Sequence, residues 1–136
     1  MSQELHAFLK SDRLPDRQQW QQAIDALGLP LELDANREPA RDRGYWRCKL
    51  DGKDTGIEIY TDDAQDVLGA YSNITKTVGK RDRVISFRWR GDLSECGCAC
   101  TAAAALASAF DAVVYDPQQD LIADAAGLIA DARQCY

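Results

Sequence analysis

The sequence predicts an α+β domain with two layers, in which ferredoxin-like strand-helix-strand units form a mainly antiparallel sheet with an added β-hairpin. The first indication is a weak internal repeat, because residues 23–34 and 105–116 both run from an alanine-bearing helix end into a short strand that ends at Asp. The second is the Asp51-Gly52 pair between two alternating runs, which is typical of a hairpin turn. The third is length, since 136 residues suit a single domain spanning 1–136 with its own core.

The N-terminal part of the chain predicts a strand, a helix and a second strand. Residues 4–9 form a short apolar run that suits the first strand. A helix is expected over 15–27, with Trp20 on its apolar stripe and therefore in the core. Residues 29–34 alternate leucine with other residues, which indicates a half-buried strand, and the charged residues 35–44 predict a loop.

The middle of the chain predicts the hairpin, a helix and another strand. The hairpin strands are expected over residues 45–50 and 55–60. The helix is expected over 63–78, where acidic residues near its start suit the helix dipole. The next strand is expected over 83–90, with Ile85, Phe87 and Trp89 facing one side of the sheet and Val84, Ser86, Arg88 and Arg90 facing the other.

The cysteine-rich segment ECGCACTAAA opens a second large helix, expected over 93–110. Asp92 is placed as its N-cap. Small apolar residues on one stripe, beginning with Leu93, predict that this helix packs close to the sheet. A strand over 112–116, a short strand over 119–122 and a terminal helix over 123–136 complete the expected order.

Three of the five cysteines fall at alternate positions in that helix. Cys96 and Cys100 share a face, but Cys98 points about 200° away from both, so the three thiols cannot bind one ion. We therefore expect free thiols, no metal and no other cofactor, with Cys96 and Cys100 packing as small apolar side chains. Because Cys96 lies in the first turn of the helix, where the dipole lowers a thiol pKa, its reactivity stays open, although the neighbouring Glu95 opposes thiolate formation.

The composition excludes several classes of partner. The chain carries a formal net charge of −6, which disfavours nucleic acid and anionic membranes as partners. The segment SFRWRG lacks the aromatic-glycine pattern of RNA-recognition domains. No apolar run is long enough to cross a membrane, and no export signal is visible, so we expect a cytoplasmic protein.

Catalytic motifs are sparse. No GxSxG, Walker loop or GxGxxG occurs, and His6 is the sole histidine. The remaining candidate for acid-base work on an anionic substrate is a carboxylate-arginine cluster, which would make the chain a small enzyme or ligand-binding domain. Its members are Glu58, Arg88, Arg90, Asp92 and Glu95. Helix capping and surface ion pairs explain the same residues without any activity, so the enzyme is the alternative interpretation.

The stretch that runs from FRWRGD through AAAALA to AVVYDPQ, within residues 87–118, resembles segments of small bacterial proteins. In outline the whole chain is similar to the bacterial immunity proteins that neutralise polymorphic toxins. That resemblance implies stoichiometric binding that occludes a toxin's active site. It carries over no functional residue, because such families share no common motif.

A protein partner is the leading expectation, and two groups of residues are candidates for its binding surface. Residues 91–136 carry one basic and seven acidic side chains, and Asp116, Asp120 and Asp124 would attract a basic surface such as a toxin's substrate cleft. Tyr45 and Trp46 on the hairpin are anchor candidates if they are exposed, because aromatic residues supply much of the energy at interfaces. A homo-oligomer remains possible.

Overall fold

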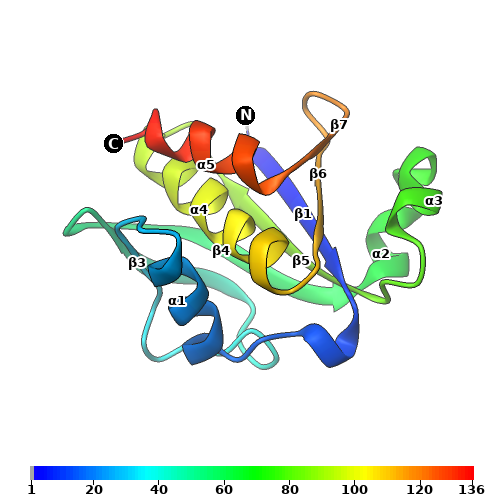
Figure 1. The fold of residues 1–136 in the computed structure, drawn as a ribbon, viewed down its shortest axis with the longest axis horizontal. Helices are drawn as coiled ribbons and strands as arrows, with labels where there is room; N and C mark the ends of the chain where they lie inside the picture. The colour runs from blue at the N-terminus through cyan, green and yellow to red at the C-terminus, as the bar shows by residue number, and fades with distance from the viewer. Residues whose placement is uncertain (1) are drawn as a thin grey trace.

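A computed structural model describes residues 2–136 and confirms the α+β fold. Seven strands form one sheet in the order β2-β3-β4-β5-β1-β6-β7, and every neighbouring pair is antiparallel. The strands are β1 (Gln3–Leu9), β2 (Leu31–Glu32), β3 (Gly44–Leu50), β4 (Lys53–Asp63), β5 (Arg83–Trp89), β6 (Val113–Asp116) and β7 (Leu121–Ala123). The α-helices are α1 (Arg17–Ala26), α2 (Ala64–Leu68), α3 (Thr75–Val78), α4 (Leu93–Ala109) and α5 (Ala125–Arg133). Figure 1 shows α4 between α1 and α5 on one side of the sheet.

The four strands β6-β1-β5-β4 have the order of a ferredoxin-like sheet, and β5, α4 and β6 form one of its split strand-helix-strand units. In the first unit, the sequence predicted residues 29–34 as the strand after α1. The structure instead places β4, the second strand of the hairpin, beside β5, whereas β2 lies at the far edge of the sheet. Of the two hairpin strands, only β3 is therefore an addition to the ferredoxin-like sheet, because the longer strand, β4, belongs to its four central strands.

The Asp51-Gly52 turn forms as the sequence predicts. Both residues have positive φ angles, 53° and 78°, and Leu50 pairs with Lys53 across the turn. Two consecutive residues with positive φ make a type I′ turn, whose twist matches that of the strands beside it. This turn fixes the register of β3 against β4 and so decides which side chains of the hairpin face the helices.

Alternation along β1 builds a core on each face of the sheet. Leu5, Ala7 and Leu9 point into the main core beneath α1 and α4, whereas Phe8 points into a smaller cluster on the opposite face. Trp20 is fully buried, as predicted. Its ring centroid lies 5.9 Å from that of Phe87, and its indole nitrogen donates to the carbonyl oxygen of Ala102 at 3.0 Å.

Helix α4 is enclosed from all sides over most of its length. Every residue from Gly97 to Leu106 is buried, because α1 and α5 flank the helix and the sheet lies beneath it. A β-carbon built on Gly97 would lie 2.8 Å from a methyl carbon of Leu50 and 3.0 Å from Cβ of Cys135. The close packing of the C-terminal end of the chain on α4 therefore requires a residue without a side chain here.

The single helix predicted over 63–78 is wrong. The segment forms α2, a 3-10 turn (Ser72–Ile74) and α3, because Gly69 ends the first helix and Tyr71 leaves the helical region with φ of −134° and ψ of 61°. These short pieces pack over Phe8, Val84 and Tyr115 on the second face of the sheet. They leave the rest of that face uncovered.

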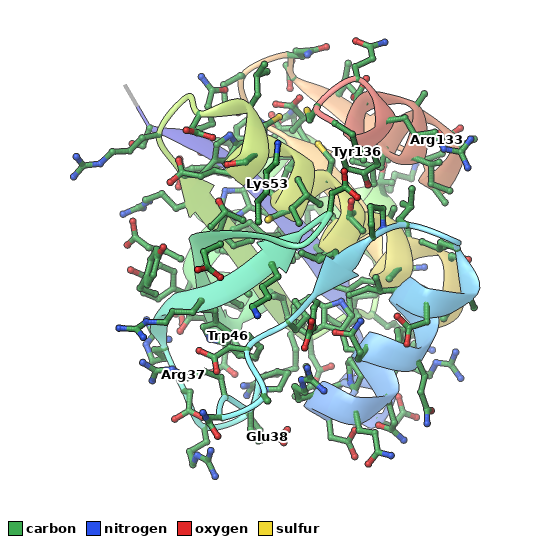
Figure 2. The ribbon with its side chains drawn as sticks, turned by 90° about the vertical axis from the view of Figure 1, so that its left-hand side faces the viewer. Arg37, Glu38, Trp46, Lys53, Arg133 and Tyr136 are labelled. Carbon is green, nitrogen blue, oxygen red and sulfur yellow. The ribbon has the colours of Figure 1, made fainter. Side chains whose placement is uncertain are left out.

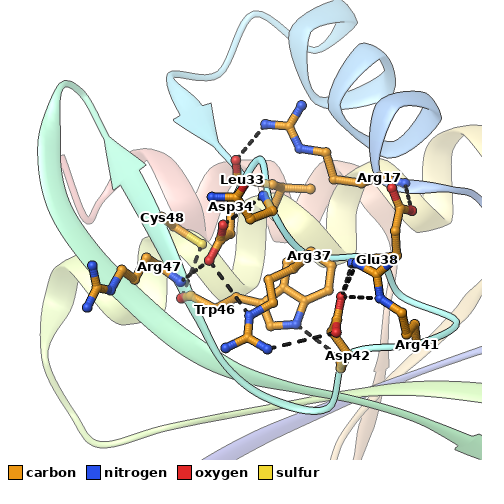
Figure 3. Close-up of polar contacts among 11 residues, drawn as sticks. Arg17, Leu33, Asp34, Arg37, Glu38, Arg41, Asp42, Trp46, Arg47 and Cys48 are labelled. Carbon is orange, nitrogen blue, oxygen red and sulfur yellow. Dashed lines mark hydrogen bonds and ion pairs between the residues drawn. The ribbon is translucent and has the colours of Figure 1, made fainter.

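Side chains from α1 occupy the outer edge of the sheet at β2. Gln21 donates to the carbonyl oxygen of Leu31 and accepts from the backbone N–H of Leu33, each at 2.8 Å. Arg17 donates to the carbonyl oxygen of Leu33 at 2.5 Å, as Figure 3 shows. The backbone of this edge is therefore hydrogen-bonded without a further strand.

Within residues 2–136, none of the helices combines the length and the apolar character that crossing a bilayer requires.

Candidate functional site

A groove of about 620 Å³ lies between α5, β7, the first turn of α4 and the start of β1. We call it the C-terminal groove. Leu5, Trp89 and Leu128 are buried side chains that line it. Its remaining surface carries three kinds of group: exposed leucine and isoleucine side chains, thiols, and carboxylates.

The exposed apolar surface of the described chain is concentrated on this groove. Leu93, Leu121 and Ile122 line it and are 68%, 40% and 41% exposed, and together they make up three of the five exposed large hydrophobic residues among those described. The sequence placed Leu93 on the sheet-facing stripe of its helix, and this expectation is wrong. As the first residue of α4, Leu93 lies beyond the part that α1 and α5 enclose. Grouped exposed apolar side chains are typical of interaction sites.

Three carboxylates line the same groove: those of Asp116, Asp124 and Asp131. Asp116 accepts from the backbone N–H of Gln118 at 3.0 Å, and Asp124 caps α5 by accepting from the N–H of Gly127 at 2.8 Å. Both residues therefore shape the walls of the groove. Asp131 is exposed on α5 and lines the groove as well.

Asp120, the third predicted partner-binding aspartate, lies outside the lining of the groove. Its carboxylate accepts from the hydroxyl of Tyr115 at 2.6 Å and from the amide of Asn73 at 3.0 Å. The structure thus brings two of the three predicted aspartates to the groove and gives the third a role in holding the loop between β6 and β7.

All five cysteines have free thiols, and they separate as the helical geometry predicts. Cys98 is buried, and its thiol interacts with that of Cys48 in the core. Cys96 and Cys100 face the groove with their sulfur atoms 4.0 Å apart, and Cys135 joins them from the segment after α5. Across residues 2–136, no three His, Cys, Asp or Glu side chains are grouped as a metal ion requires.

The three groove thiols have different acidities. The neighbouring thiol of Cys100 is the main cause that lowers the pKa of Cys96 to about 7, and the Cys135 thiol lowers it further, against the opposing effects of burial and of Asp131 and Asp116. The Cys135 thiol itself donates to the carbonyl oxygen of Asp131 at 3.4 Å. Donation to Cys96 and burial raise the pKa of Cys100. Burial raises the pKa of Cys135 to about 11. Of the three, therefore, Cys96 is the most acidic thiol.

The two hairpin aromatics differ in exposure. Tyr45 is 51% exposed and packs over Gly56, where an added β-carbon would overlap its ring. Trp46 is fully buried, so the expectation that it is available to a partner is wrong. It faces α1 and α4, and its indole nitrogen donates to the carbonyl oxygen of Asp42 at 3.2 Å.

A loop covers the Trp46 side of the hairpin. Figure 2 shows the loop with Arg37 and Glu38 next to Trp46, at the other end of the view from Arg133 and Tyr136. Asp42 accepts from Glu38 N–H at 2.8 Å and pairs with Arg41 at 2.8 Å, and these contacts, drawn in Figure 3, hold the loop in place. The loop over 35–44 that the sequence predicted is therefore ordered by its own charged residues.

The predicted carboxylate-arginine cluster does not converge. Asp92 caps α4 by accepting from the N–H of Ser94 at 2.8 Å, and Glu95 accepts from the N–H of Arg90 at 3.1 Å. Glu58 and Arg88 pair across β4 and β5 on the face of the sheet away from α4. Capping therefore explains Asp92 and a backbone contact explains Glu95, whereas Glu58 and Arg88 lie on the opposite face of the sheet.

The face of the sheet opposite α4 holds, in its uncovered part, a hollow of about 410 Å³ that the sequence did not predict. His6 lies in it, nearly buried, with its Nδ1 atom 2.8 Å from the hydroxyl of Ser86. Burial lowers the pKa of His6, and its Nε2 atom has no partner. Arg88 and Glu4 form an ion pair of 3.2 Å beside them. The pairing register of β1 and β5 would have indicated this hollow, because it sets His6 opposite Ser86 and Glu4 opposite Arg88.

Comparison of the chain with models of protein families, with curated proteins and with solved structures finds no match.

Proposed function

We propose that this chain is a protein-binding module whose C-terminal groove receives an apolar side chain from a basic segment of a partner protein. The observation that carries the proposal is the coincidence of exposed Leu93, Leu121 and Ile122 with the carboxylates that line the same groove. Covering one such side chain contributes on the order of 1.5 to 3 kcal/mol. A partner that covers two or three of them gains enough to offset part of the cost of association.

The charge around the groove favours a basic partner. Asp116, Asp124 and Asp131 line it, and Arg133 is the sole basic residue in the last third of the chain. A field of this sign speeds the approach of lysine-rich or arginine-rich surfaces and repels nucleic acid. Tyr45 lies on the hairpin, outside the groove, and serves as the comparison residue rather than as part of the docking site.

A toxin with a basic substrate cleft is the partner class that the resemblance to immunity proteins suggests. The basic side chains at the rim of such a cleft would face the carboxylates of Asp116, Asp124 and Asp131 while an apolar side chain of the toxin enters the groove. In that interpretation, binding occludes the toxin and requires no catalytic group on this chain. In that interpretation the gene for a larger secreted effector should lie beside the gene for this chain, and such an effector is the protein to test first.

The experiment is a comparative capture from the native host with purified bait proteins. The baits are the unchanged chain, Leu93→Lys in the groove, and Gln18→Lys at an exposed position of α1 that adds the same charge elsewhere. We expect one protein to be retained by the unchanged chain and by Gln18→Lys and lost with Leu93→Lys. Tyr45→Ser in parallel measures whether the hairpin contributes.

The captured protein is then purified and its affinity for each bait is measured. Equal affinity for Leu93→Lys and the unchanged chain contradicts docking at the groove. If no protein binds directly and a small molecule raises the melting temperature instead, the chain is a ligand-binding domain and the proposal is wrong.

A further inference from the structure

We propose that the C-terminal groove is also a thiol modification site, where Cys96 attacks a low-molecular-weight disulfide and Cys135 then displaces the adduct to form a Cys96–Cys135 disulfide. This inference concerns the chemistry of three thiols and does not depend on the identity of any protein partner. It starts from the convergence of Cys96, Cys100 and Cys135 on one groove from two separate parts of the chain.

Cys96 is the nucleophile that the surroundings favour. It lines the groove and is only partly buried, whereas Cys48 and Cys98 are enclosed in the core. The thiol of Cys100, whose sulfur lies 4.0 Å from that of Cys96, and the nearby thiol of Cys135 hold its pKa at about 7. A thiolate at the start of a helix is also favoured by the helix dipole, and α4 runs for seventeen residues from Leu93.

Acidic groups around Cys96 oppose the thiolate. Asp131 on α5 and Asp116 at the end of β6 both raise its pKa, but not enough to cancel the effect of the two neighbouring thiols. Glu95, its neighbour in sequence, is turned toward the backbone N–H of Arg90 instead. The influence of the neighbouring thiols, that of Cys100 above all, therefore outweighs that of the carboxylates.

Cys135 is a better resolving thiol than Cys100. Residues four apart on a helix have Cβ atoms roughly 5 to 6 Å apart, whereas a disulfide needs roughly 3.5 to 4.5 Å, so Cys96 and Cys100 cannot join without distorting α4. Cys135 lies on the segment after α5, against Gly97. Its neighbours Gln134 and Tyr136 are exposed, and a shift of this segment toward Cys96 would loosen the 3.1 Å contact between the hydroxyls of Tyr136 and Thr101.

The chemistry balances with one equivalent of the small disulfide. In the first step the Cys96 thiolate bonds to one sulfur of the small disulfide, whose S–S bond breaks and releases one small thiolate. In the second step Cys135 loses its proton and bonds to the Cys96 sulfur, and the second small thiol leaves. The two protein thiols are oxidised, and the small disulfide is reduced to two thiols.

The experiment uses the reduced full chain and glutathione disulfide as the probe, near neutral pH. Intact-mass and peptide mass spectrometry follow the products, and circular dichroism checks that each variant is folded. The unchanged chain should end with a Cys96–Cys135 disulfide. Cys135→Ser should stop at a glutathione adduct on Cys96, and Cys96→Ser should form neither product.

Cys100→Ser tests the donor network by a second measurement. The rate of alkylation of Cys96 by iodoacetamide should rise with an apparent pKa near 7 in the unchanged chain and move to higher pH in this variant. Cys48→Ser, in the core, is the matched control and should leave the profile unchanged.

Three results would overturn the inference. They are first modification at a cysteine other than Cys96, a Cys96–Cys100 disulfide as the end product, and reaction of Cys96 no faster than that of an unstructured thiol. The partner capture described above has a separate readout, so either proposal can fail without the other.

Discussion

The two ends of α4 have the same kind of sequence and different surroundings. From Gly97 to Leu106 the helix is enclosed by the sheet, α1 and α5, and every residue is buried. At its first turn, Leu93 is exposed and Cys96 lines the groove. The comparison shows that small apolar residues do not by themselves define a core, because the neighbouring elements decide which part of such a helix is covered.

The largest expected effect is at the enclosed end. Trp20→Ala removes a ring that packs against Phe87 and a hydrogen bond to the carbonyl oxygen of Ala102, so it should lower the free energy of unfolding by about 3 to 5 kcal/mol. Leu93→Ala at the open end should change it by less than about 0.5 kcal/mol. Urea denaturation of both variants measures the difference, and comparable losses would contradict the contrast between the two ends.

Gly97 marks the boundary between the two regions, and Gly97→Ala should lower the free energy of unfolding by about 1 to 3 kcal/mol. Its new β-carbon would meet Leu50 at 2.8 Å and Cβ of Cys135 at 3.0 Å, and this overlap should exceed the gain in helix propensity. Gly69→Ala has more room, with its nearest neighbour 3.8 Å away, and serves as the control. Thermal unfolding of the two variants distinguishes a close helix contact from a general intolerance of alanine.

Cys100 and Cys96 test the same boundary on one helical face. Cys100 is buried, so Cys100→Ala should cost on the order of 1 kcal/mol through the small cavity it leaves. Cys96→Ala should cost less than half as much, because Cys96 is only partly buried. Chemical denaturation under reducing conditions provides both values. A larger loss for Cys96 would place the edge of the core nearer the start of α4.

The smallest effect concerns charge at the open end. In the described part of the chain, no hydrogen bond or ion pair engages the carboxylate of Asp131, so Asp131→Asn should leave stability unchanged. With a basic partner it should slow association by a few-fold at low salt, and the difference should shrink as salt screens the charge. Stopped-flow binding measures both. Asp120→Asn, outside the groove, is the comparison and should affect association less.

Local signals predicted the elements that local chemistry controls. The Asp51-Gly52 turn, the Asp92 cap and the burial of Trp20 follow from neighbouring residues, and the structure confirms each. The burial of Trp46 could also have been predicted from the sequence, because Trp46 alternates with Cys48 and Leu50 on the core face of β3. The sequence-based expectation treated Tyr45 and Trp46 as exposed together, but two adjacent residues of a strand face opposite sides of the sheet.

The remaining features depend on contacts between distant parts of the chain. The position of β4 beside β5 depends on pairing between residues 58–63 and 83–88, which no local pattern specifies. The C-terminal groove brings together Leu5, Leu93 and Leu128 from three elements. Cys135 carried no signal in sequence, since its approach to Cys96 depends on how the end of the chain packs on Gly97.

The side chains that α1 places along β2 also bear on how the protein behaves at high concentration. An edge strand with unpaired backbone groups can template the addition of a strand from another molecule, which is a common route to aggregation. Here Gln21 and Arg17 already occupy the carbonyl oxygens of Leu31 and Leu33 and the N–H of Leu33, three backbone groups that an incoming strand would need. This edge is thereby closed to intermolecular strand addition by two polar side chains, which keeps one border of the sheet from recruiting further copies as the chain accumulates.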